Sequence, residues 1–232
     1  YVALGAVNAL TANAGEKSLL YRVGTTQPLL DALTFDDKAV RYSAAIAIAA
    51  AGPKQSFDES RLVVQNLSQA LAEMPSGNNN SGLWNDQLVD SYALNAAQVM
   101  FELAQAQNRV IDLSAALKTL INATNDRRFQ IRVFAANTLA RLDDPEAQRA
   151  IAAMALSENN SVEMRNYAFE ALSVSAKINA NLLSDETIDE IYSLVASQDI
   201  APELRSAAAR AFGALNLPPH QIKTLILDQA KS

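Results

Sequence analysis

Apolar residues recur along this chain with the spacing of one helix face. In the nine-residue phrase that begins at Val40, apolar residues occupy the first, fifth, sixth and ninth positions. At 3.6 residues per turn these positions lie on one side of a helix. The phrase returns at Ile131, Met164 and Leu204 and, in weaker form, at Val2 and Val89. Successive copies begin 33 to 49 residues apart, which predicts a helical repeat of about forty residues.

A second apolar helical segment precedes each of the later copies. We expect these helices at residues 27–33, 60–73, 112–123, 145–156 and 185–196, with a further one at 219–230. Asp144 before Pro145, and Ser184 before two acidic residues, are typical helix N-caps. Because one helix pair cannot bury its own apolar face, tandem pairs have to stack. The pattern therefore predicts an all-α fold, an α-α superhelix of about five helix pairs.

Composition agrees with this fold and removes several classes of function. Nearly one residue in five is Ala, which favours closely packed helices. The chain has no Cys and one His, His220, so zinc-thiolate sites, thiolate nucleophiles and His-rich metal sites are excluded. Its net charge of −6 argues against a broad nucleic-acid surface. We expect no metal, no cofactor, no nucleic-acid partner and no membrane span, since the longest apolar run, 44–52, is half of the ~20 residues required.

The repeated phrase Val-Arg-x-x-Ala-Ala-x-x-Leu, preceded by an Asp or Asn turn, resembles the HEAT repeat, particularly the HEAT-like subset with short helices. The resemblance covers nearly the whole chain and implies a right-handed solenoid. It says little about function, because the family includes scaffolds, adaptors and a few enzymes. Two copies depart from the pattern, with Asp90 and Ala3 in the place of the Arg.

The second position of the phrase carries Arg41, Arg132, Arg165 and Arg205. This position lies at the edge of the apolar face. We interpret the four as a structural ladder that binds carboxylates or loop carbonyls of neighbouring repeats, as the resemblance implies. An anion-binding row of arginines is the alternative.

The fourth, seventh and eleventh positions of the phrase lie opposite the apolar face. By resemblance, the second helix of each pair lines the concave groove, so this stripe is the predicted partner-binding surface. Its candidate residues are Tyr92, Asn95, Phe134, Asn137, Arg141, Tyr167, Glu170 and Arg210. Aromatic rings give rigid contact area, and Asn binds a peptide backbone as donor and acceptor. The alternative is that the aromatic residues seal the gaps between adjacent helices.

We predict one repeat domain over residues 1–232, with an insertion loop at 74–86. Because the sequence begins at Tyr1 without Met, we expect a fragment of a longer protein. Trp84 is either a binding anchor of the loop or a hydrophobic staple before an Asn85 N-cap.

No phosphate loop or nucleophile motif occurs in the sequence. We therefore expect a non-catalytic scaffold that binds a protein or peptide in its groove. The alternative is a subunit that holds a chromophore, similar to a bilin lyase, or another enzyme-associated subunit. An acidic stripe at Asp185, Glu186, Asp189 and Glu190 is interpreted as a solvated helix face, with a docking site for a basic partner as the alternative.

Overall fold

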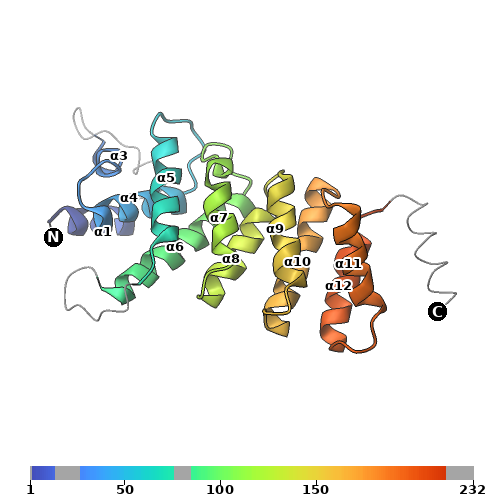
Figure 1. Cartoon of the computed structure of the whole chain (residues 1–232). Helices are drawn as coiled ribbons and strands as arrows, with labels where there is room; N and C mark the ends of the chain where they lie inside the picture. Colours follow the sequence, from blue (N-terminus) through green and yellow to red (C-terminus); the bar gives the residue numbers. More distant parts are fainter. Residues whose placement is uncertain (1, 14–26, 76–84, 218–232) are drawn as a thin grey trace. The chain divides into compact units, whose positions relative to one another are not determined.

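The computed structural model describes residues 2–13, 27–75 and 85–217. Throughout these residues the regular structure is helical, without a strand (Figure 1). First and second helices of successive pairs follow one another along the chain as the repeat predicts. The predicted helix at 219–230, His220 and Trp84 lie outside the described residues. The chain divides into two compact units, 1–138 and 139–232. That residues 1–232 form one repeat domain stays a prediction.

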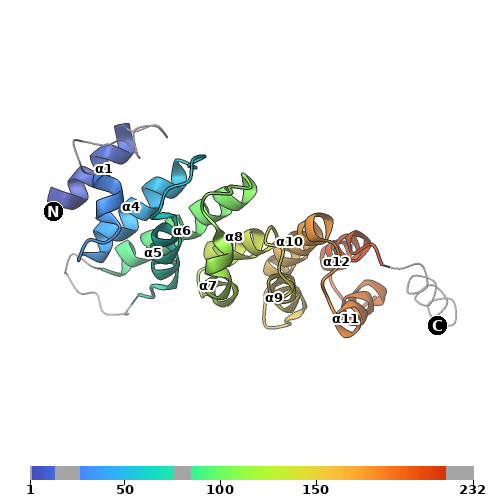
Figure 2. The same ribbon diagram turned by 90° about the horizontal axis from the view of Figure 1, so that it is seen from above.

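The first unit stacks three helix pairs after an initial helix. Its elements are α1 (Val2–Asn13), α3 (Pro28–Ala32), α4 (Lys38–Ala50), α5 (Ser60–Ala72), α6 (Asp86–Gln105), the 3-10 turn η1 (Leu113–Ala116), α7 (Leu117–Ala123) and α8 (Phe129–Leu139), whose last residue belongs to the second unit. The second helices α4 and α6 lie side by side, and so do the first helices α5 and α7 (Figure 2). Ala44, Ala45, Ala96 and Ala97 are almost fully buried, so small side chains allow these helices to approach closely.

The second unit contains two further pairs. Its helices are α9 (Pro145–Leu156), α10 (Val162–Asn179), α11 (Asp185–Ala196) and α12 (Pro202–Ala214). The second helices α10 and α12 pack against each other, as do the first helices α9 and α11. Phe169 and Ile151 are fully buried at its centre. The expected all-α superhelix of helix pairs is confirmed.

The helix starts follow from local hydrogen bonding. The Asp144 carboxylate accepts from the amides of Glu146 and Ala147, and the Ser184 hydroxyl accepts from Thr187. Asn85 accepts from the Leu88 amide at the start of α6. Each predicted cap occupies its place because its oxygen satisfies a first-turn amide that has no partner within the helix.

Buried or half-buried amide side chains tie loops to the next repeat. Asn66 donates to Leu33 O at 3.0 Å and Asn108 donates to Pro53 O at 2.8 Å. In the second unit Gln148, fully buried, donates to Ser175 Oγ and Ala180 O, each at 3.0 Å, and accepts from the Leu182 amide at 2.7 Å. These bonds satisfy loop backbone groups that burial would otherwise leave unpaired.

Candidate functional site

The predicted stripe begins in the first unit with Tyr92, which lies inside the molecule. The Tyr92 side chain is 7% exposed, and its ring meets the Tyr42 ring edge-on at a centroid distance of 5.8 Å. Its hydroxyl donates to Ala39 O at 3.2 Å and lies 2.9 Å from Ser43 Oγ. Burial raises the pKa of Tyr92. Tyr92 therefore joins α6 to α4 and offers little surface to a partner.

The remaining stripe residues of the first unit differ in exposure. Asn95 is exposed on α6, one turn beyond Tyr92. Phe134 is half-buried and its ring lies 5.8 Å from the Phe101 ring, so it also fills the space between helices. Asn137 is half-buried and donates to Val133 O of its own helix at 2.9 Å. Asn95 is thus the member of this set that a partner reaches most directly.

The stripe of the second unit is more open. Tyr167 is 39% exposed on α10, and Glu170, one turn later, lies 3.5 Å from Arg210 of α12. Both charged side chains are more than half exposed. Arg141, by contrast, is half-buried beyond the end of α8, and burial lowers its pKa. Tyr167, Glu170 and Arg210 therefore share one accessible face of two adjacent helices.

Two acids on this face were not among the predicted residues. Glu163 and Glu203 are both exposed and each stands one residue before its copy of the repeated phrase. Glu170 and Arg210 hold the same position in their copies of the phrase and lie side by side as an ion pair. Glu163 and Glu203, seven residues earlier in each case, therefore occupy matching places on α10 and α12. The sequence already shows these two acids at matching positions in successive copies, so they could have been predicted from it.

The four arginines of the predicted ladder share one kind of contact. Each donates to a backbone carbonyl at the end of the preceding helix or in the turn after it, over 2.7–3.3 Å. The acceptors are Phe35 O and Asp36 O for Arg41, Thr124 O for Arg132, Ala155 O for Arg165, and Ser197 O for Arg205. Such bonds satisfy terminal carbonyls and place a cation at the negative helix end. In these contacts the ladder joins the two helices of one pair, whereas contacts with neighbouring repeats had been expected.

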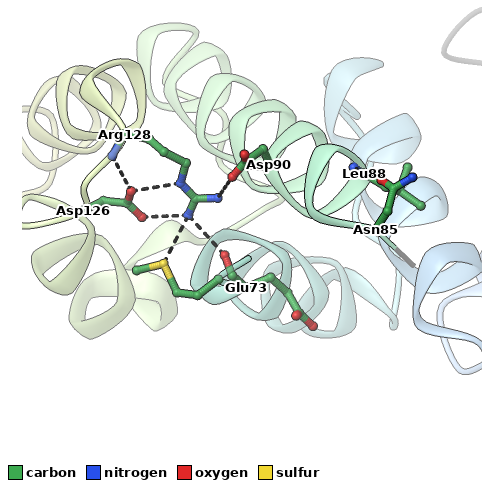
Figure 3. Close-up of polar contacts among 7 residues, drawn as sticks. Glu73, Asn85, Leu88, Asp90, Asp126 and Arg128 are labelled. Atoms are coloured by element: carbon green, nitrogen blue, oxygen red, sulfur yellow. Dashed lines mark hydrogen bonds and ion pairs between the residues drawn. The ribbon is translucent and has the colours of Figure 1, made fainter. Parts of the chain in front are cut away.

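Arg128 forms a second cluster, where the pattern is broken (Figure 3). Its guanidinium contacts both Asp126 oxygens, at 2.9 and 2.7 Å, and Asp90 Oδ1 at 3.0 Å. It also donates to Glu73 O at 3.1 Å. Asp90 takes the place of the repeat Arg, and an arginine from the following repeat compensates its charge. The departure at Asp90 is visible in the sequence, but its partner Arg128 is not.

The charges in this cluster hold one another ionised. Burial alone would raise the pKa of Asp126, but hydrogen bonds from Arg128 and its positive charge outweigh burial, so the pKa is lowered.

On the neighbouring turn, the Glu73 carboxylate accepts from Lys38 Nζ at 2.8 Å and from the Tyr42 hydroxyl at 3.0 Å. Burial, helped by this bond and by the charge of Glu73, raises the pKa of Tyr42 to about 12. These contacts bind three successive turns together.

Neither a metal centre nor a membrane helix is found in the part of the chain that is described. Across residues 2–13, 27–75 and 85–217, no three His, Asp or Glu side chains are placed to hold a metal ion. Among the same residues, no helix has the length and apolar character needed to cross a bilayer.

Comparison with solved structures identifies the fold. A designed armadillo repeat protein in complex with the peptide (KR)4 superposes with a TM-score of 0.51 at 16% identity, over 92% of this chain and 91% of that chain. The chain is a helical repeat solenoid. A second designed armadillo repeat protein gives a TM-score of 0.49 at 18% identity, over 92% and 93% of the two chains. No protein-family model and no curated protein matches the sequence. The HEAT-like resemblance is confirmed at this level, because HEAT and armadillo repeats are both stacked helical solenoids.

Proposed function

We propose that this solenoid is a non-catalytic scaffold that binds a segment of a partner protein on the exposed face of its second helices. The observation that carries the proposal is the shared face of α10 and α12, where Tyr167, Glu170 and Arg210 are all exposed. In the first unit, Asn95 on α6 is likewise exposed. An exposed tyrosine ring and an amide that both donates and accepts suit a peptide.

Charge defines the partner further. On the α10–α12 face Arg210 offsets Glu170, which leaves the charges of Glu163 and Glu203 without a nearby compensating cation among the described contacts. The whole chain carries −6. A segment rich in Lys or Arg is complementary to this face, and its cations can also lie against the Tyr167 ring. The armadillo neighbour was solved with (KR)4, which makes that peptide a suitable probe.

The test is the fluorescence anisotropy of a labelled (KR)4 peptide titrated with the chain. The double variant Glu163→Gln, Glu203→Gln should bind more weakly. Two exposed charge contacts of ~0.5 kcal/mol each give ~1 kcal/mol, or about a fivefold loss of affinity.

The matched control is the double variant Glu186→Gln, Glu190→Gln on α11. It removes the same number of exposed acids, one of them also in a first helical turn, away from the proposed face. Equal losses for both variants would mean that the peptide follows net charge alone. Absence of binding to the parent chain would refute a basic partner.

Tyr167→Ala separates the aromatic contribution from charge, since it should weaken binding without reducing the salt dependence. A weaker salt dependence with unchanged affinity would contradict a direct contact with the ring. No contact among the described residues favours the chromophore-binding alternative.

A further inference from the structure

The exposed large apolar side chains of the first unit are gathered in its turns. Among the described residues of that unit they are Phe35, Met74 and Phe129, which are 46%, 55% and 38% exposed. Phe35 lies between α3 and α4, Met74 follows α5, and Phe129 opens α8 after α7. Phe35 and Met74 therefore lie between the two helices of a pair, and Phe129 lies at the end of such a turn, as the first residue of α8.

Side-chain contacts hold these three turns together. Lys38 beside the first turn pairs with Glu73 in the second at 2.8 Å. Arg128 in the third turn donates to Glu73 O at 3.1 Å and lies 3.8 Å from Met74 Sδ. Phe35, Met74 and Phe129 thus lie along three linked turns, which we term the turn edge.

Apolar exposure of this kind is unusual for turns, which generally carry polar residues. Single exposed apolar residues are common, whereas three of them at successive linked turns are a candidate interaction surface. A hollow of about 340 Å³ opens beside Phe35, and its lining is mostly polar, with Arg41, Gln65 and Gln69 beside Leu33 and Leu62. The hollow offers room for one side chain with a polar end, while Met74 adapts to varied partners.

The exposed charges differ between the two ends of the turn edge. Asp36 and Asp37 are exposed beside Phe35, and Arg127 is exposed beside Phe129. The paired ions Lys38, Glu73 and Arg128 lie between them. A complementary partner is basic where it meets the first turn and acidic where it meets the third.

We propose that the turn edge is a second docking surface, separate from the second-helix face. It binds a protein segment with apolar residues spaced to meet Phe35, Met74 and Phe129, a basic end at Asp36 and Asp37, and an acidic end at Arg127. The chemistry differs from that of the basic segment proposed for α10 and α12, so the two surfaces take different partners.

The probe is a phage-displayed library of random twelve-residue peptides, selected on the parent chain in the presence of excess (KR)4 to block the other surface. Enriched peptides should have spaced apolar residues and opposite charges at their two ends. The triple variant Phe35→Ser, Met74→Ser, Phe129→Ser should bind them at least about tenfold more weakly.

The control is the double variant Val162→Ser, Ile178→Ser, which removes comparably exposed apolar side chains of the second unit. It should bind the same peptides as the parent does. The double variant Asp36→Lys, Arg127→Glu exchanges the charges at the two ends of the turn edge. It should bind the originally enriched peptides more weakly than the parent does.

A second measurement uses the unmodified chain, so the result does not depend on the folding of a variant. Methyl-labelled methionine should show a saturable shift of the Met74 signal with an enriched peptide, and none with (KR)4. The proposal is overturned if no peptide is enriched, if the triple variant binds as well as the control does, or if the Met74 signal stays unchanged.

Discussion

Arg128 provides a strong test of how the broken repeat position is stabilised. Its side chain is 15% exposed, and its partner Asp126 is 3% exposed. We consider Arg128→Met, which keeps much of the aliphatic volume and removes every side-chain donor to Asp126, Asp90 and Glu73 O.

The structure sets the magnitude. Removal of one partner from a buried ion pair costs ~3–5 kcal/mol because the other charge remains buried. The amide of residue 128 still donates to Asp126 Oδ1 at 2.7 Å in the parent structure, and the charge of Arg127 also favours ionised Asp126. Both persist in the variant, so we expect the lower end of that range, about 3 kcal/mol.

The assay is urea unfolding of Arg128→Met beside Arg127→Met. Arg127 is exposed, so its variant should change the free energy of unfolding by less than about 0.5 kcal/mol. Addition of Asp126→Asn to Arg128→Met should restore part of the loss, since it removes the buried charge. Equal stability of the two arginine variants would refute the argument.

The pH dependence carries the same information. The folded pKa of Asp126 is lower than its ordinary value, so its contribution is present above that value, about 4, and is lost as pH falls through the folded pKa. The parent should therefore lose more stability below about pH 4 than Arg128→Met does.

Three further predictions concern the polar interior. Gln148→Leu should lower the free energy of unfolding by ~2–3 kcal/mol, measured in urea, because it leaves buried partners such as Ser175 unpaired. Arg165→Met should cost ~1–3 kcal/mol in the same assay because Ala155 O loses its donor at 2.9 Å, whereas unchanged stability would contradict the ladder. Tyr42 has a folded pKa of about 12, above the ordinary 10, so its contribution to the free energy of unfolding is present below pH 10 and is lost as pH rises through 12. Tyr42→Phe should therefore lose less stability at alkaline pH than the parent does, and an equal loss in both proteins would disprove this role of Tyr42.

The helix pairs were predictable because local rules decide them. Apolar spacing places the helices, and residues such as Asp144 and Ser184 begin them through bonds to nearby amides. At 112–123 the expected single helix is instead the 3-10 turn η1 followed by α7. Helical periodicity cannot distinguish these, because both place Leu113, Ala116 and Leu120 inward.

The site was less predictable because exposure depends on neighbouring helices. Tyr92 and Tyr167 hold the same position in the repeated phrase, yet one is 7% and the other 39% exposed. Tyr92 is covered because its hydroxyl forms hydrogen bonds with Ser43 Oγ and Ala39 O of α4. Arg128 lies 38 residues from Asp90, a separation at which no local pattern indicates a pair.

The most direct test of the proposed function is residue-resolved NMR of the isotope-labelled chain during titration with unlabelled (KR)4. We expect saturable shifts of the amide signals of Tyr167, Glu170 and Arg210, with those of Glu186 and Glu190 on α11 unchanged. Shifts confined to the α11 stripe, or no shifts at all, would contradict it.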